Sequence, residues 1–423
     1  MRIVLLFILF QILFINSSYP NIKDNVFCDV LSEELVNEGF ENIIIKIVEG
    51  ELLLTYENRI FRDEVKAIEK INGIIYGDIQ NKQQLFDTII LLPQNRNIPL
   101  VRIQFTVNDL INFYENRITS VQFSDELKIS FDVDKTWSVL SEVLPDNVST
   151  NRFECVISPG LKSELDEFGD PVKLQIDIVP SLRVSPGKGL MIKGEYIFPV
   201  VHRDFDVGDP VDACRPGEMS INQVIRFPES IFFSASAGLF SDNRYGFDME
   251  LRKYFFGDIF NCGVNIGYTG EARYYEGKYK TGLIDDLSYY VDSEVRVPWY
   301  NITISVNYGQ YLNEDKGFRV DLKREFNETE IGFFYTHTSS NLLGGLSTGG
   351  FNIAIPLFPD KYSKPGFIRL RPAEYFKWEY SYKHFIYFHQ KKYSTGYELK
   401  NFIKRLNIDY IREQIKNSYL DKN

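Results

Sequence analysis

The second half of the chain alternates apolar and polar residues in segment after segment. In 301–310, the apolar residues Ile302, Ile304, Val306 and Tyr308 interleave with Thr303, Ser305, Asn307 and Gly309. Because successive strand residues point to opposite faces, each such segment forms a strand with one apolar and one polar face. A sandwich would turn the apolar faces inward, whereas an outer-membrane barrel turns them to lipid and keeps polar groups in its lumen.

Thirteen segments read as strands, at intervals typical of a barrel with short turns on one side. They are 152–158, 172–184, 189–200, 218–227, 231–240, 244–255, 259–269, 288–297, 300–311, 317–323, 329–338, 350–357 and 376–388. A bacterial barrel normally has an even number of strands, and 367–371 is a further candidate, so we predict an antiparallel barrel of roughly 12 to 14 strands over 150–389.

The polar faces of these strands carry charges of both signs. Phe247, Met249 and Leu251 alternate with charged neighbours, and the solvent face of a sandwich would show the same pattern. Segments of about nine to eleven residues match a tilted membrane crossing, which favours the barrel. We therefore expect a polar lumen, with these candidates for contact with a substrate: Lys173, Gln175, Asp177, Asp242, Arg244, Asp248, Glu250, Arg252, Arg319 and Asp321.

The start of the chain has the build of a secretory signal peptide, which we place at 1–18. Arg2 precedes an apolar run over 3–15, and Asn16, Ser17 and Ser18 follow it. Nothing later supplies the roughly 18 to 20 consecutive apolar residues of a membrane helix. We expect an exported protein that meets a membrane through strands.

Composition and motifs argue against several classes of function. The formal charge of −11 argues against a nucleic-acid partner. The four cysteines form no CxxC pair, and His384 and His389 are five apart on an expected strand, so we expect neither a metal nor a cofactor. His337 lies near Ser339 and Ser340, but no G-x-S-x-G elbow is present, and a polar loop explains this stretch better. A non-catalytic protein is expected.

Mixed helix and strand signals over 26–146 predict a small α/β domain. Helices are expected at 30–39, 62–71 and 108–115, and strands at 42–48, 52–57, 100–107 and 126–133. Its densest polar cluster comprises Tyr56, Glu57, Asn58, Arg59 and Arg62. Either these residues contact a partner, or Glu57 pairs with Arg59 or Arg62 at the surface and contributes little.

Two further segments carry expectations of their own. Residues 242–246 predict an Asx-type turn, with an Arg–Asp contact folded into the lumen as the alternative. The charged tail over 390–423 has an apolar stripe of Leu399, Phe402, Ile403 and Leu406, which predicts an exposed helix on the periplasmic side.

Several motifs in order resemble the YjbH family of exopolysaccharide-associated outer-membrane proteins. They are Tyr56-Glu57-Asn58-Arg59, Ser158-Pro159-Gly160-Leu161, Asp170-Pro171-Val172, Pro180-Ser181-Leu182-Arg183, Gly238-Leu239-Phe240-Ser241-Asp242-Asn243-Arg244-Tyr245-Gly246-Phe247-Asp248, Ile266-Gly267-Tyr268-Thr269-Gly270, Gly349-Gly350-Phe351-Asn352-Ile353, Ile355-Pro356-Leu357 and Arg369-Leu370-Arg371-Pro372. The stretch Ala373-Glu374-Tyr375-Phe376-Lys377 departs from the polar, glycine-containing pattern expected there, as does the tail from Gln390.

The resemblance implies a role in export or assembly of exopolysaccharide or capsule, similar to that of GfcD-type barrels. It implies an outer-membrane location with the N-terminal domain in the periplasm. The partners implied are polysaccharide, outer-membrane lipid, an outer-membrane lipoprotein and a periplasmic capsule protein. A general porin and an outer-membrane lipid-modifying enzyme stay open as alternatives; the expected periplasmic domain favours a secretion role over a simple pore.

Overall fold

The computed structural model of the protein describes residues 26–81, 85–165, 172–203, 213–241, 243–255, 259–275, 277–297, 300–340, 344–381, 393–402, 406 and 408–418. The expected signal peptide, Asp242, His384 and His389 lie outside these residues, and so does part of the tail. Among the described helices, none combines the length and the apolar character needed to cross a membrane.

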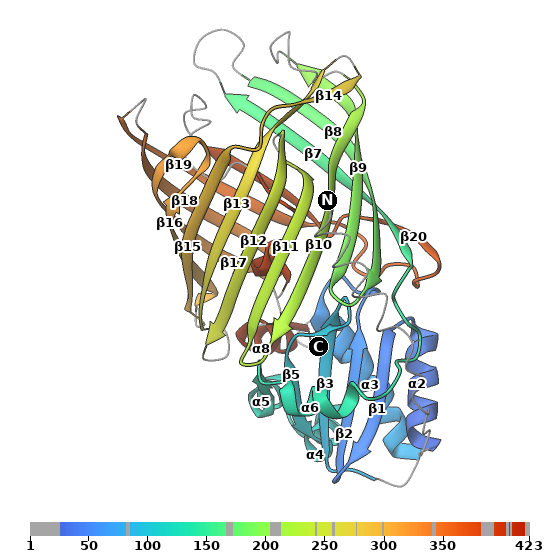
Figure 1. Ribbon diagram of the computed structural model, residues 1–423. Helices are drawn as coiled ribbons and strands as arrows, with labels where there is room; N and C mark the ends of the chain where they lie inside the picture. Colours follow the sequence, from blue (N-terminus) through green and yellow to red (C-terminus); the bar gives the residue numbers. More distant parts are fainter. Residues whose placement is uncertain are drawn as a thin grey trace.

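The N-terminal part is a small α/β unit, drawn in blue to green at the bottom of Figure 1. Its elements are α2 (Val26–Glu38), β1 (Glu41–Val48), β2 (Glu51–Glu57), α3 (Glu64–Asn81), β3 (Thr88–Asn95), β4 (Ile98–Pro99), β5 (Arg102–Thr106), α4 (Val107–Tyr114), α5 (Ser120–Glu126), β6 (Lys128–Ser130) and α6 (Asp134–Leu140). The sheet order is β1-β2-β3-β5-β6, with β4 on β3. Strands β2 and β3 are parallel because helix α3 crosses over between them.

A large sheet follows, and most of its connections are short antiparallel turns. Its strands are β7 (Phe153–Leu165), β8 (Val172–Gly187), β9 (Leu190–Arg203), β10 (Arg215–Phe227), β11 (Ile231–Phe240), β12 (Arg244–Phe255), β13 (Phe260–Tyr275), β14 (Lys278–Thr281), β15 (Asp286–Val297), β16 (Ile302–Gln310), β17 (Lys316–Phe326), β18 (Thr329–Ser340), β19 (Gly344–Pro356), β20 (Ile368–Pro372) and β21 (Tyr375–Ser381). The chain is therefore mainly β, with a large curved sheet above a small α/β unit (Figure 1).

The sheet is not closed among the described residues, which corrects the expectation of a fully antiparallel ring. Its path runs from β20 through β7 to β19 and β21, with β14 attached to β13. Strand β20 pairs with β7 in parallel, whereas β21 pairs with β19 antiparallel. Only Ala373 and Glu374 separate β20 from β21, so one stretch of chain contacts both edges of the wall.

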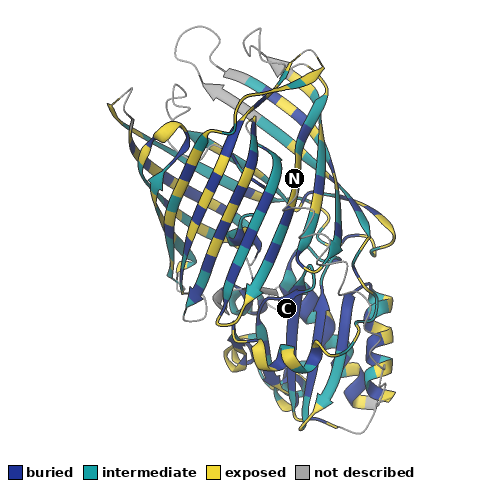
Figure 2. Cartoon of the chain, in the orientation of Figure 1, coloured by how far each residue is buried: buried dark blue, intermediate teal, exposed yellow. Residues whose placement is uncertain are grey.

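The alternation of exposure along the strands shows which face is outside. Phe247, Met249 and Leu251 on β12 are 46%, 49% and 47% exposed, whereas their neighbours Asp248, Glu250 and Arg252 are at most 6% exposed. Figure 2 shows the same alternation of yellow and dark blue across the neighbouring strands. A sandwich would bury the apolar face, so this arrangement is that of a barrel wall with a polar interior.

One apolar core joins the α/β unit, the base of the wall and the end of the chain. It contains most of the buried residues of the α/β unit together with Val224, Phe232 and Tyr254 of the wall. Helices α7 (Leu399–Phe402) and α8 (Ile408–Ser418) add Leu399, Phe402, Leu406, Tyr410, Ile411 and Ile415. Leu399, Phe402 and Leu406 of the predicted apolar stripe are thus covered by the protein itself rather than forming an exposed helix, and Ile403 lies outside the described residues.

Candidate functional site at the base of the lumen

Five of the ten predicted lumen residues form ion pairs within the wall, namely Arg244, Glu250, Arg252, Arg319 and Asp321. Arg252 is 1% exposed, its Nη2 lies 2.7 Å from Asp292 Oδ1, and its Nε donates to Glu250 Oε1 at 2.9 Å. Arg244 Nη2 lies 2.6 Å from Asp286 Oδ2 and also donates to Thr269. The Arg244 side chain, from the expected turn at 242–246, therefore contacts residues of β13 and β15.

The remaining candidates follow the same pattern. Gln175 Nε2 donates to Asp177 Oδ1 at 2.8 Å, and Arg319 Nη2 lies 2.7 Å from Asp321 Oδ1. The Arg319 guanidinium also lies over the Phe334 ring at 4.0 Å. Lys173 belongs to β8, and its side chain is outside the described part of the structure. Contact of these residues with a substrate stays a prediction.

Residues 393–402, which we call the lumenal segment, lie inside the wall along β11, β12 and β15 (Figure 1). Tyr393 Oη donates to Asp248 Oδ2 at 2.8 Å, and the Leu399 backbone N–H donates to Glu250 Oε2 at 2.9 Å. Lys400 Nζ lies 2.9 Å from Asp292 Oδ2. Several acidic residues that the alternation pattern assigns to the lumen thus hold the chain's own C-terminal segment.

The polar cluster of the α/β unit is buried where that unit meets the wall, rather than at a free surface. Tyr56 is fully buried, and the Glu57 carboxylate accepts from Asn42 Nδ2 and Ser149 Oγ at 2.5 and 3.1 Å. Asn58 Oδ1 accepts the backbone N–H groups of the next turn, at Ile60 and Phe61.

The two arginines of this cluster contact other parts of the chain. Arg59 Nη1 lies 3.1 Å from Glu41 Oε2, and Arg62 makes a two-pronged pair with Glu328 of the wall at 2.7 and 3.0 Å. The expected Glu57–Arg pair is therefore not present, and all five candidate partner residues contact the chain itself. The sequence pattern had no means of showing that a second domain covers them.

A cavity of about 380 Å³, which we call the basal cavity, lies between the α/β unit, the wall and the lumenal segment. Eight basic side chains and five carboxylates line it: Arg59, Arg62, Arg96, Arg152, Arg183, Arg369, Arg371, Lys377, Glu57, Glu64, Glu154, Glu374 and Glu398. A second cavity of about 910 Å³ lies further along the lumen and shares Ala354, Lys377 and Asn401 with the first. The two cavities therefore adjoin.

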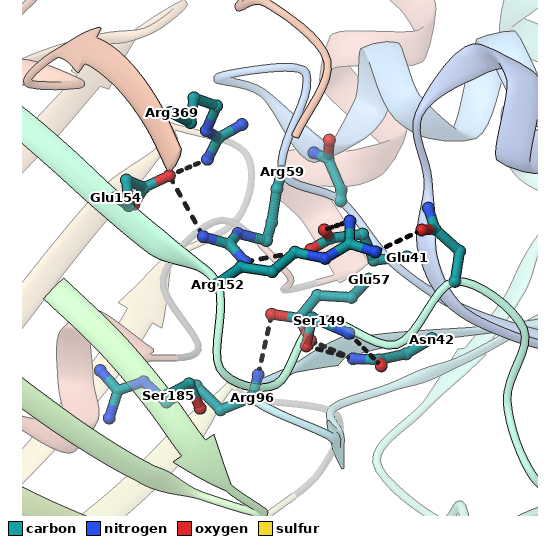
Figure 3. Close-up of polar contacts among 12 residues, drawn as sticks. Glu41, Asn42, Glu57, Arg59, Arg96, Ser149, Arg152, Glu154, Ser185 and Arg369 are labelled. Atoms are coloured by element: carbon teal, nitrogen blue, oxygen red, sulfur yellow. Dashed lines mark hydrogen bonds and ion pairs between the residues drawn. The ribbon is translucent and has the colours of Figure 1, made fainter. Parts of the chain in front are cut away.

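Strand register brings the arginines of the basal cavity together. Glu154 on β7 lies opposite Arg369 on β20 and opposite Arg183 on β8. The Glu154 carboxylate pairs with Arg369 and, at 3.5 Å, with Arg59 (Figure 3). It also pairs with Arg371 at 3.1 Å. One carboxylate thus forms ion pairs with three guanidinium groups.

Two other arginines of the basal cavity have no carboxylate within 4 Å among the described residues. Arg183 Nε donates to Ser181 Oγ at 3.2 Å. Arg96 Nη1 donates to Asn222 Oδ1 at 2.9 Å, and its guanidinium lies 4.8 Å from the centre of the Tyr397 ring. Burial lowers the pKa of Arg96 to about 10, so it stays charged at neutral pH.

Burial has the opposite effect on the pKa of an acidic residue at the edge of the basal cavity. It raises the pKa of Glu64 to about 7, although the hydrogen bond from Asn58 Nδ2 opposes the shift. Near neutral pH this carboxyl is half neutral, and the basal cavity is correspondingly more positive.

Sequence reasoning did not single out Arg96, Arg183, Arg369 or Arg371 as site residues. They come from the β3–β4 turn, β8 and β20, and only the fold brings these elements together. The one available signal was that three of them stand in or beside quoted motifs, namely Pro180-Ser181-Leu182-Arg183 and Arg369-Leu370-Arg371-Pro372.

Comparison with known families gives the same assignment as the motifs. Residues 15–208 and 217–359 match the YjbH family, described as exopolysaccharide biosynthesis protein YbjH. The chain belongs to the YjbH family. The match includes Arg59, Arg96, Glu154 and Arg183 of the basal cavity, whereas Arg369 and Arg371 lie beyond its end.

Comparisons with curated proteins and with solved structures say little beyond membership of the YjbH family. No curated protein matches the sequence closely enough to count as a relative. Among solved structures, the in-vitro folded OmpT, an outer membrane protein of Vibrio cholerae, matches with 10% identity and a TM-score of 0.27 over 48% of this chain and 80% of its own. A loop L8 deletion mutant of the same protein matches with 11% identity and a TM-score of 0.27 over 48% and 85%. Similarity at this level carries no argument about function.

Proposed function

We propose that this protein is a non-catalytic outer-membrane barrel that takes part in the export or assembly of exopolysaccharide or capsule, with its α/β unit in the periplasm. The observation that carries the proposal is the outward apolar face of the wall around a charged interior. Lipid solvates the outer face, and a lumen of charged and hydroxyl groups exchanges hydrogen bonds with sugars at little cost. Membership of an exopolysaccharide biosynthesis family supplies the substrate class.

The lumenal segment favours this role over that of a general porin. A porin needs an open aqueous lumen, whereas here residues 393–402 are bonded to the inner wall at Asp248, Glu250 and Asp292. A barrel that carries its own internal segment fits regulated passage or assembly of a polymer better than constant diffusion of salts.

Docking of a lipoprotein or a small periplasmic protein belongs to the same proposal. The face of the α/β unit toward the wall is occupied by Arg62–Glu328 and similar contacts. We therefore place a docking surface away from these contacts, where helices α4 and α5 are exposed in part.

The test is fractionation of cells that express the chain, combined with deletion of its gene. We expect the protein in the outer membrane with heat-modifiable migration on gels, and we expect the deletion strain to lose surface or secreted polysaccharide. A soluble periplasmic protein would contradict the barrel. A membrane-resident barrel whose deletion leaves the polysaccharide unchanged would instead favour a porin or a lipid-modifying enzyme.

A further inference from the structure

The basal cavity has more positive charge than its own carboxylates neutralise. Arg96 and Arg183 have no ion pair among the described residues. Arg59, Arg369 and Arg371 share Glu154, and Arg59 and Arg371 each reach one further carboxylate, that of Glu41 and that of Glu374. Removing a guanidinium from water without an anionic partner is costly. A cavity with this surplus has a strong preference for an anionic ligand.

Several buried polar atoms around the basal cavity also have no hydrogen-bond partner in the part of the chain that the structure describes. They are Arg369 Nε, Arg369 Nη1, Arg371 Nε, Glu64 Oε1, Gln94 Oε1, Tyr362 Oη and Tyr397 Oη. Arg369 is 4% exposed, so water reaches it poorly. Buried polar groups are almost always hydrogen-bonded in folded proteins, and a set of unmatched donors and acceptors around one cavity indicates a ligand that supplies the partners.

The shape and lining of the basal cavity match a sugar that carries a carboxylate. Its volume of about 380 Å³ lies in the range of roughly 300 to 1,000 Å³ found for ligand pockets. Guanidinium groups bind carboxylates through two parallel hydrogen bonds, and aromatic rings pack against the apolar face of a sugar. The rings of Tyr362, Tyr397 and Phe402 line the same cavity as Arg183 and Arg369.

We propose that the basal cavity binds an acidic sugar residue of the exported polymer, with Arg183 and Arg369 holding its carboxylate. This assignment rests on the proposed function and adds a substrate class to it. An acidic polymer would pass from the periplasmic side into the lumen through a site that recognises its charge.

The test uses the purified full chain in detergent micelles and titration calorimetry at neutral pH. The two probes are tetragalacturonic acid and its fully methyl-esterified form, which share a backbone and differ in charge. We expect the acid to bind and the ester to bind at least about tenfold more weakly, because each charge-assisted hydrogen bond contributes at least that factor. Equal binding of acid and ester, or no binding of either, would overturn the proposal.

The site is located with Arg183→Gln, because among the described residues the hydrogen bond of this side chain is to Ser181. Arg273→Gln is the matched control, since Arg273 is exposed on β13 and pairs with the exposed Glu271. Arg183→Gln should weaken binding of the acid at least about tenfold, Arg183→Lys should recover part of it, and Arg273→Gln should leave it unchanged. Heat-modifiable migration verifies that each variant is folded.

Two further arms separate alternative explanations. Inorganic phosphate that displaces the acid at equal concentration would show a general anion site, as for a lipid phosphate, and would overturn the assignment to an acidic sugar. In cells, a deletion strain that loses polymer while Arg183→Gln retains full export would leave the proposed function standing and remove the acidic-sugar site. A deletion strain that retains its polymer would remove the proposed function itself.

Discussion

Arg252 shows how the wall accommodates charge on its inner face. The side chain is 1% exposed and contacts Glu250, Asp292 and Asn261, while Lys400 of the lumenal segment reaches the same Asp292. Such a buried network is stable only while its charges balance, because the removal of one member leaves the others without a partner in a poorly solvated place.

We expect Arg252→Met to destabilise the folded barrel by about 3 to 5 kcal/mol, because Glu250 and Asp292 lose their shared cation. The measurement is the temperature at which the folded gel band converts to the unfolded one. Lys253→Met is the control on the same strand, since Lys253 pairs with the exposed Glu229 and should change that temperature very little. Similar effects for both variants would contradict the buried network.

Glu64 makes the stability of the α/β unit depend on pH. Its folded pKa of about 7 lies above its usual 4.5, so between these values the folded protein holds a proton that the unfolded chain has released. The free energy of unfolding therefore falls as the pH rises through this window, and it levels off above the folded pKa.

Glu64→Gln should remove this dependence, because the amide is neutral at every pH. We expect the unfolding temperature of the wild type to decline between pH 5 and pH 8, by an amount equivalent to at most about 3 kcal/mol, and that of the variant to decline less. Parallel pH profiles for the two proteins would show that Glu64 does not titrate in this range.

At the scale of elements, the sequence predicted well those strands that have one exposed face and one buried face. The expected ranges 231–240 and 244–255 coincide with β11 and β12, because a half-exposed strand shows its period directly. Strand β3 was missed: residues 89–92 are Ile-Ile-Leu-Leu, and a central strand buried on both faces shows no alternation.

The lumenal segment and the basal cavity were beyond sequence reasoning for a different reason. The apolar stripe of the tail was recognised, but a local pattern does not say which surface covers it. Likewise, Arg183 becomes a neighbour of Arg369 only through the register of β20, β7 and β8. Such contacts depend on the pairing of β20 with β7, whose residues are more than two hundred positions apart.

The contacts of the lumenal segment predict that it blocks the lumen. Lys400→Glu should place a carboxylate against Asp292 and Glu294 and so detach the segment. We expect a clear increase in ion conductance through planar bilayers. Lys416→Glu on α8, which loses a pair with the exposed Asp125, is the charge-matched control. Equal conductance of Lys400→Glu and wild type would mean that the segment does not obstruct the pore.

At the scale of the whole molecule, the α/β unit and the wall form one body. Arg226 of β10 donates to the carbonyl oxygens of Pro99 and Leu100 at 3.2 and 2.9 Å and to that of Phe131. The ring of Phe131 stacks on that of Tyr254 at 5.2 Å. The periplasmic unit should therefore hold a fixed orientation under the lumen.

Arg226→Ala should loosen this junction, because three carbonyl groups lose their donor. We expect trypsin to cleave at Arg152, between the two parts, roughly tenfold faster or more than in the wild type. Arg117→Ala, on the exposed side of the α/β unit, should leave the cleavage rate unchanged. Equal rates for both variants would indicate that the shared core alone fixes the orientation.

The stretch from Ile368 to Ser381 pairs with β7 through its first half and with β19 through its second. Strand β7 pairs with β8 on one edge as soon as β8 is made, but its other edge has no partner until residues 368–372 are available. The lumenal segment follows this stretch in the sequence, and it lies inside the wall. Biogenesis must accordingly bring residues 393–402 into the interior at about the time when residues 368–381 pair with β7 and β19, so that the interior is filled as the two edge strands gain their partners.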